Sequence, residues 1–161
     1  MRQLIRWVAV CGNVLFVFSL SGCGSDVKPP PDVGATVQVT GVVELDGKPV
    51  PGVIVAFRPF TTQQYNGAAG VTDASGKYEL KTDIGEGKTK PGVPLGWYHV
   101  TVSKFVKPDG TSPPQNSTDP KDMKGARESM PMAYTSPNDR MTYEVTSAGG
   151  TYDIKINSDG K

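Results

Sequence analysis

Short stretches in which apolar and polar residues alternate recur along most of the chain. Val37, Val39, Val43 and Leu45 fall on one face of an extended segment, and polar side chains fall on the other. Because successive side chains of a β-strand point to opposite faces, this period of two predicts a strand with one buried face. The sequence predicts six further strands, over 53–57, 69–72, 77–82, 96–105, 142–145 and 152–156.

Turn signals separate most of these segments. Asp46-Gly47 is typical of a tight hairpin turn, and Asp73-Ala74-Ser75-Gly76 and Ala148-Gly149-Gly150 also turn the chain. A composition with Gly 19 and Pro 14 favours many short strands over helices. We therefore predict an all-β fold, a seven-stranded antiparallel sandwich of the Ig-like kind. The residues expected to point inward are Val37, Val39, Val43, Val55, Phe57, Tyr78, Leu80, Tyr98, Val100, Val102, Tyr143, Val145, Tyr152, Ile154 and Ile156.

Two stretches interrupt the strand pattern. Residues 83–95 are expected to form a loop, and residues 106–134, which contain five prolines, a long loop insertion. Structureless segments as long as 106–134 are uncommon in compact domains and are usually functional or disordered. One short helix is possible there, capped by Asp119 and continuing over 124–130, although Gly125 opposes it.

The N-terminus has the layout of a secretory signal peptide. Arg2 and Arg6 precede an apolar run, Trp7 to Leu20, that is shorter than the ~20 residues of an ordinary membrane span. The run ends in Leu20-Ser21-Gly22-Cys23, which resembles the lipobox of bacterial lipoproteins, in which the cysteine is acylated and becomes the mature N-terminus. The alternative is an ordinary cleaved signal followed by an incidental cysteine.

The lipoprotein resemblance implies a signal peptide over 1–22 and lipid attachment at Cys23 by acyl chains such as palmitate. Residues 23–34, with three consecutive prolines, are expected to form a lipidated flexible tether. Cys11 would be removed with the signal, so no thiol would remain for a disulfide. The resemblance predicts a membrane-anchored protein of the cell envelope, periplasmic or surface-facing. Gly24 in place of Asp favours the outer membrane in organisms that sort lipoproteins by that residue.

Bulk charge gives no sign of a nucleic-acid partner. The chain has Lys+Arg 17 and Asp+Glu 16, and removal of 1–22 takes away Arg2 and Arg6 but no acid. This near-neutral balance lacks the basic excess by which proteins attract nucleic acids or anionic surfaces.

Three motifs resemble carboxypeptidase regulatory-like domains. They are Gly41-Val42-Val43-x-x-Asp46-Gly47-Lys48-Pro49-Val50-Pro51-Gly52-Val53-x-Val55-x-Phe57, Thr72-Asp73-x-x-Gly76-Lys77-Tyr78-Glu79-Leu80, and Gly96-Trp97-Tyr98-x-Val100-Thr101-Val102. The resemblance covers roughly 36–157 and implies one transthyretin-like sandwich over 35–161, with 106–134 as an insertion. It also implies an accessory, non-catalytic module found on exported proteins.

Few residues suggest catalysis or metal binding. His99 is the only histidine, and a catalytic histidine needs a nucleophile as its partner. The sequence contains no nucleophile motif, and no thiol would remain after processing. Asp73, Ser75 and the acidic stretch 83–86 lack the alternate ligand spacing of a calcium loop and are better explained as turn residues. We therefore predict no enzyme activity, no metal and no cofactor.

Trp97 is the residue most suited to contact a ligand. An aromatic side chain on the solvent face of a sheet can stack on a sugar or anchor a partner chain. The interpretation we favour is that the 106–134 loop folds back and covers it. The predicted function is a structural or protein-interaction module that contacts an envelope protein through the Trp97 face together with that loop. The alternative is a carbohydrate-binding module that uses an exposed Trp97 face to bind a glycan.

Overall fold

The structure, a computed structural model, describes residues 33–61, 65–114 and 119–160. Every regular element in these ranges is a strand except one turn of 3-10 helix, so the all-β prediction is confirmed. The predicted signal peptide, Cys23 and nearly all of the predicted tether lie outside the described residues.

The larger of the two main sheets is antiparallel throughout. Its strand order is β13 (Thr142–Val145), β10 (Gly96–Ser103), β4 (Ile54–Pro59), β5 (Ala68–Val71), β7 (Lys81–Asp83) and β8 (Thr89–Pro91). The longest pairing in this sheet joins β10 to β4, with Val100 opposite Phe57 and Val102 opposite Val55. These four side chains share the inner face, because every second residue of each strand points the same way.

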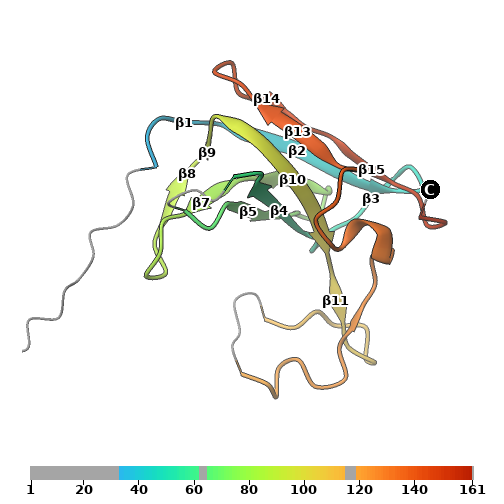
Figure 1. The fold of residues 1–161 in the computed structure, drawn as a ribbon. Coiled ribbons are helices and arrows are strands. Elements are labelled where there is room, and N and C mark those ends of the chain that lie inside the picture. The colour runs from blue at the N-terminus through green and yellow to red at the C-terminus, as the bar shows by residue number, and fades with distance from the viewer. Residues whose placement is uncertain (1–32, 62–64, 115–118, 161) are drawn as a thin grey trace, which may run out of the picture.

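The second main sheet is built around β2 (Val39–Leu45). β6 (Lys77–Glu79) and β3 (Lys48–Pro49) pair with it antiparallel. β14 (Gly150–Thr151) and β15 (Ile154–Ile156) pair with it parallel. Figure 1 shows these strands packed over the larger sheet.

The antiparallel seven-stranded topology that we predicted is therefore wrong in its last strand, which runs parallel to β2. Gly149 and Gly150, with φ of 62° and 144°, turn the chain after β13. They direct it to the edge of β2 in the other sheet instead of back along β13 as a hairpin. Each predicted strand is present, and short strands such as β8 and β9 (Val93–Pro94) add to them within the expected 83–95 loop.

The predicted strand over 77–82 is divided between the two sheets. Tyr78 in β6 lies opposite Gly41 of β2, whereas Lys81 in β7 lies opposite Ala69 of β5. Leu80, fully buried, is the point at which the chain crosses. Opposite Tyr78, Gly41 is required because a Cβ there would overlap the carbonyl oxygen of Tyr152.

The predicted core is confirmed for twelve of its members, which are buried between the sheets: Val39, Val43, Val55, Phe57, Tyr78, Leu80, Tyr98, Val100, Val102, Val145, Ile154 and Ile156. Val37, Tyr143 and Tyr152 are only partly buried and pack against the rim of this cluster. The ring of Phe57 lies at its centre, with its centroid 5.8 Å from that of Tyr98 and 6.1 Å from those of Tyr143 and Tyr152. Further core residues not predicted include Val53, Val93, Met130, Tyr134 and Met141.

The predicted long loop contains a projecting hairpin, which we define as the described residues 105–114 and 119–128. Its base is the antiparallel pair β11 (Phe105–Val106) and β12 (Arg127–Glu128). Figure 1 shows it extending from the end of β10 away from the two sheets. The 3-10 helix η1 (Met132–Tyr134) then returns the chain to the body and buries Tyr134.

The short helix that we considered over 124–130 does not form. The Asp119 carboxylate does accept a hydrogen bond from the Lys121 amide, at 2.9 Å, as a cap would. The bonds that follow are isolated turns, and Gly125 ends them with a φ of 76°. Among the described residues, no helix has the length and apolar composition needed to cross a membrane.

Candidate functional site

Trp97 is exposed in the structure, which corrects the interpretation that the 106–134 loop covers it. Its side chain is 51% exposed. The chain leaves the sheet after Ser103, at the end of β10 away from Trp97, and the hairpin that follows extends away from the sheets. The indole therefore lies open on the solvent face of the larger sheet.

Two other large apolar side chains are exposed at the same end of the sheet. Phe60, which directly follows β4, is 47% exposed, and Leu95, which directly precedes β10, is 50% exposed. The Phe60 amide donates a hydrogen bond to the Trp97 carbonyl oxygen at 3.1 Å, so the β4–β10 pairing continues to this point. We call Phe60, Leu95 and Trp97 the Trp97 patch.

The sequence analysis missed Phe60 because the predicted strand covered only 53–57, whereas β4 continues to Pro59. Continued by one residue, the alternation of β4 places Phe60 on the same face as Arg58, which lies opposite His99. The Phe60 and Trp97 ring centroids are 6.4 Å apart with an interplanar angle of 47°. The two rings are thus neighbours that present separate planes to solvent.

His99 is held in place beneath the patch. Its ring stacks on Phe60, with 4.0 Å between centroids and 16° between planes. Its Nδ1 lies 3.0 Å from the carbonyl oxygen of Asn138, a distance at which an Nδ1–H donates a hydrogen bond. Both interactions fix the orientation of the imidazole and support Phe60, which is a structural role.

Polar residues surround the patch on the neighbouring strands. Trp97 lies opposite Glu144 and His99 lies opposite Thr142 on β13. The glutamate is exposed, as is Arg58 on β4. The result is an aromatic surface with charged groups at its margins.

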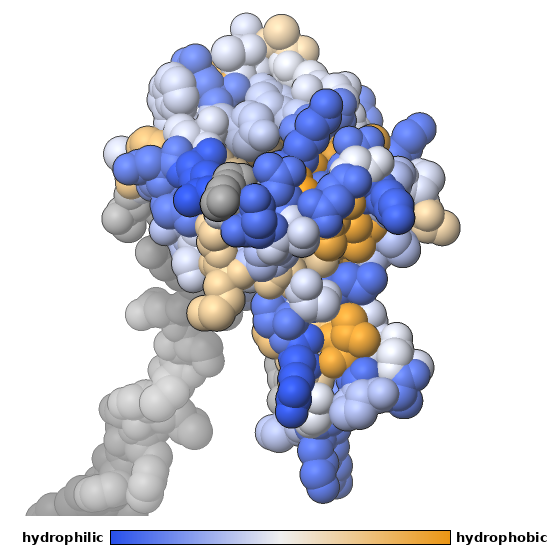
Figure 2. All heavy atoms as spheres, turned by 90° about the vertical axis from the view of Figure 1, so that its right-hand side faces the viewer, coloured by the Kyte–Doolittle hydropathy of each residue, from blue (hydrophilic) through white to orange (hydrophobic). Residues whose placement is uncertain are grey.

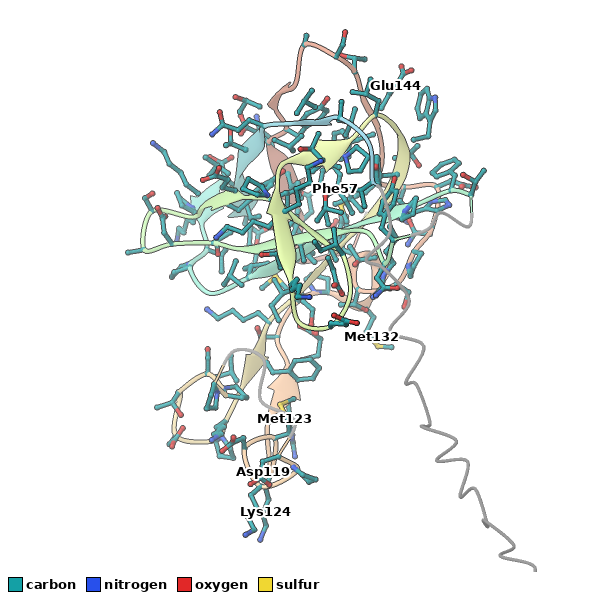
Figure 3. All side chains as sticks on the ribbon, turned by 90° about the vertical axis from the view of Figure 1, so that its left-hand side faces the viewer. Phe57, Asp119, Met123, Lys124, Met132 and Glu144 are labelled. Atoms are coloured by element: carbon teal, nitrogen blue, oxygen red, sulfur yellow. The ribbon has the colours of Figure 1, made fainter. Side chains whose placement is uncertain are left out.

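The Trp97 patch and the projecting hairpin lie at opposite ends of the molecule, so they do not form the single partner surface that we predicted. Figure 3 shows Glu144, the cross-strand neighbour of Trp97, at one end of the molecule, and Asp119, Met123 and Lys124 on the hairpin at the other end. β10 separates the two features along its whole length. Each must therefore be considered as a separate surface.

Glu128 fixes the base of the hairpin. Its carboxylate accepts hydrogen bonds from the Ser103 hydroxyl and from the Lys104 and Met130 amides, the last two at 2.8 Å. The Ser129 amide also donates to the Lys104 carbonyl oxygen at 2.9 Å. These bonds tie both strands of the hairpin to the end of β10 and define the direction in which it projects.

The hairpin carries exposed apolar side chains beyond this base. Phe105 and Met123 are both exposed, whereas Asp119, Lys121 and Lys124 supply charge near them. Figure 2 shows apolar atoms on the hairpin among hydrophilic ones, below the body of the protein. Because the hairpin projects away from the core, these apolar side chains bury little of their surface within the protein and are available to a partner.

A groove of about 1430 Å³ crosses the opposite edge of the sandwich. Its lining includes Asp73, Glu79, Asp83 and the lysines Lys77 and Lys81. The Asp73 carboxylate accepts hydrogen bonds from the Ser75 amide, the Ser75 hydroxyl and the Lys77 amide, which hold its pKa below the usual range. Its role is that of a turn residue, as the sequence indicated.

Asp83 is used in the same way. It accepts hydrogen bonds from the Gly85 amide at 2.8 Å and from the Asn66 side chain at 3.2 Å. In the part of the chain that the structure describes, no three His, Cys, Asp or Glu side chains are grouped so that they could hold a metal ion.

Comparison with known proteins assigns no family. No family model matches the chain, and no curated protein matches it. A search of solved structures finds a similarity to BcpA, the major pilin subunit of Bacillus cereus, in its D312A variant, with 14% sequence identity and a TM-score of 0.40. The match covers 76% of this chain and 30% of the pilin chain, so the chain spans less than a third of that protein's length.

Proposed function

We propose that this chain is a non-catalytic, lipid-anchored module of the cell envelope that binds another envelope protein through its projecting hairpin. The observation that carries the proposal is the hairpin itself, which extends from the sandwich with exposed Phe105 and Met123 and is tied at its base by Glu128. Recognition elements are commonly loops that a rigid scaffold positions.

The anchor is proposed from the sequence. Leu20-Ser21-Gly22-Cys23 after an apolar run resembles a lipobox, and the motifs of 36–157 resemble a carboxypeptidase regulatory-like domain. The first resemblance implies export and lipidation, and the second implies an accessory, non-catalytic module of exported proteins. Two or three acyl chains would hold such a module at a membrane stably, because each buried methylene contributes about 0.8 kcal/mol.

The non-catalytic part of the proposal is supported by the environment of His99. A general base needs a nucleophile or substrate within hydrogen-bond reach. The contacts of this imidazole are instead the ring of Phe60 and the backbone carbonyl of Asn138.

Two sets of variants test the proposal. Cys23→Ala should move the protein from the membrane to the soluble fraction, or leave it unprocessed, with loss of incorporated acyl label. In a pull-down from solubilised membranes, Phe105→Ser combined with Met123→Ser should lose the partners that the parent recovers. Met132→Ser is the matched control, because Met132 is exposed but lies in η1 on the body.

Recovery of the same partners by the parent and the hairpin variant would contradict the assignment of the hairpin. Membrane retention of a processed Cys23→Ala protein, with its acyl label intact, would contradict the anchor. The two parts of the proposal therefore fail separately.

A second candidate function, carbohydrate binding, is favoured by the exposure of Trp97. The indole lies open beside Glu144, and a sugar ring can stack on such a surface while a carboxylate accepts its hydroxyl hydrogens. Titration with soluble envelope oligosaccharides should then change Trp97 fluorescence, and Glu144→Gln should weaken the change.

A further inference from the structure

The Trp97 patch lies at the end of the sandwich where the N-terminal segment joins it. β1 (Thr36–Val37), the first described strand, pairs with β9, and Thr36 lies opposite Pro94. Leu95 is the next residue after Pro94, and Trp97 follows two residues later. Figure 1 shows β1 and β9 beside the start of β10, with the projecting hairpin at the far end.

The path of the chain at this end is fixed by side-chain bonds. The Thr36 hydroxyl donates to the Pro91 carbonyl oxygen at 2.9 Å, and the Lys90 ammonium donates to the Gly34 carbonyl oxygen at 2.6 Å. Val33 is itself buried. The segment that leads to Cys23 therefore starts from a defined place on the same end of the body as the patch.

The intervening chain is short. Nine residues, 24–32, lie between Cys23 and Val33, so ten Cα–Cα steps join the two positions. At a limit of ~3.3–3.6 Å per residue, they span at most about 35 Å. An acylated Cys23 would thus hold this end of the sandwich within about one domain diameter of the lipid surface.

We propose that the Trp97 patch contacts the bilayer that holds the anchor, with the Trp97 indole in the headgroup region and Phe60 and Leu95 at the acyl boundary. The inference rests on the proposed lipid anchor and names the contact that the anchor brings within reach. Tryptophan favours membrane–water interfaces because it combines a large apolar ring with an N–H donor.

In this arrangement a patch with low affinity for membranes is enough to make the contact. Three exposed apolar side chains would not bind a soluble domain to membranes, but the anchor makes the second contact intramolecular and raises its effective concentration. The flanking Arg58 and Glu144 have opposite charges, so the contact depends on apolar burial rather than on anionic lipid.

The test uses the processed, lipidated protein purified from membranes and reconstituted into vesicles of phosphatidylethanolamine and phosphatidylglycerol. The chain has Trp 2, and removal of 1–22 takes away Trp7, so fluorescence reports Trp97 alone. Vesicles with brominated acyl chains should quench it, and the same vesicles should protect it from aqueous acrylamide. Phe60→Ser and Leu95→Ser should each lower the ratio of docked to undocked protein about tenfold. Met132→Ser, an exposed apolar residue outside the patch, should leave that ratio unchanged.

Each outcome decides between the two proposals. Protein that does not float with the vesicles lacks the anchor. This result would contradict both the proposed anchor and the docking contact that rests on it. Protein that floats while Trp97 stays open to acrylamide and unquenched by brominated lipid keeps the anchor but overturns the docking contact. In that case the patch faces water and is left for a glycan or protein ligand.

Discussion

Phe57 in β4 and Phe60 directly after it show at the residue scale how a spacing of three residues separates a core residue from a surface residue. Phe57 is fully buried among Tyr98, Tyr143 and Tyr152, whereas Phe60 stacks on His99 at the surface. An odd spacing along a strand places the two rings on opposite faces of the sheet.

Phe57→Ala should therefore destabilise the protein by ~3–5 kcal/mol, since it removes a buried ring and leaves a cavity that the surrounding tyrosines cannot fill. Phe60→Ala is the control and should cost less than about 1 kcal/mol, because much of its ring already faces water. Chemical denaturation followed by circular dichroism measures both. Equal losses for the two variants would show that the face of β4 has been assigned wrongly.

At the same scale, alternation predicted most of the core in the longer strands, but it missed Val93 in the short strand β9. Tyr143 and Tyr152 alternate correctly but sit at the rim, where their hydroxyls donate to the carbonyl oxygens of Asp153 and Glu144. Met130, Tyr134 and Met141 were missed because they reach the core from irregular chain after the hairpin. Trp97 was chosen correctly as a solvent-face residue, but its openness depended on where the long loop goes, which no local pattern encodes.

At the element scale, strand positions were predictable and strand partners were not. The 77–82 stretch reads as one strand, yet it pairs with β2 before Leu80 and with β5 after it. The parallel pairing of β15 with β2 likewise joins segments that are distant in sequence. In both cases several segments share a similar alternating pattern, so contacts between residues distant in sequence decide which strands pair.

The base of the hairpin is held by hydrogen bonds to a single side chain, Glu128. Glu128→Ala removes the acceptor shared by Ser103, Lys104 and Met130. The hairpin base should then open more often, and tryptic cleavage after Lys121 and Lys124 should become about tenfold faster.

The melting temperature of the body should change little in this variant, because the two sheets keep their contacts. Glu144→Ala, which removes an exposed carboxylate from β13, is the matched control and should be cleaved at the parental rate. An unchanged cleavage rate in Glu128→Ala would mean that β11–β12 pairing alone holds the hairpin.

On the scale of the whole molecule, β10 connects two surfaces of different kind. Its first residues carry the Trp97 patch beside the strand that leads to the N-terminal segment, and its last residues lead into the hairpin. If the anchor and the patch both meet the bilayer, the hairpin points away from it. A module with this polarity holds its partner-binding element at a defined height above the membrane.

This polarity can be measured with single thiols, because Cys11 is removed with the signal and Cys23 is acylated in the proposed mature form. Lys124→Cys at the hairpin tip should react with a maleimide-linked polymer equally fast in vesicles and in detergent. Leu95→Cys, an exposed position in the patch, should react about tenfold more slowly in vesicles than in detergent, because the bilayer covers it. Protection of Lys124→Cys with Leu95→Cys left open would mean that the hairpin, and not the patch, faces the lipid. Since each site is compared with itself in detergent, differences in intrinsic thiol reactivity cancel, and the change in rate reports the orientation of the anchored protein.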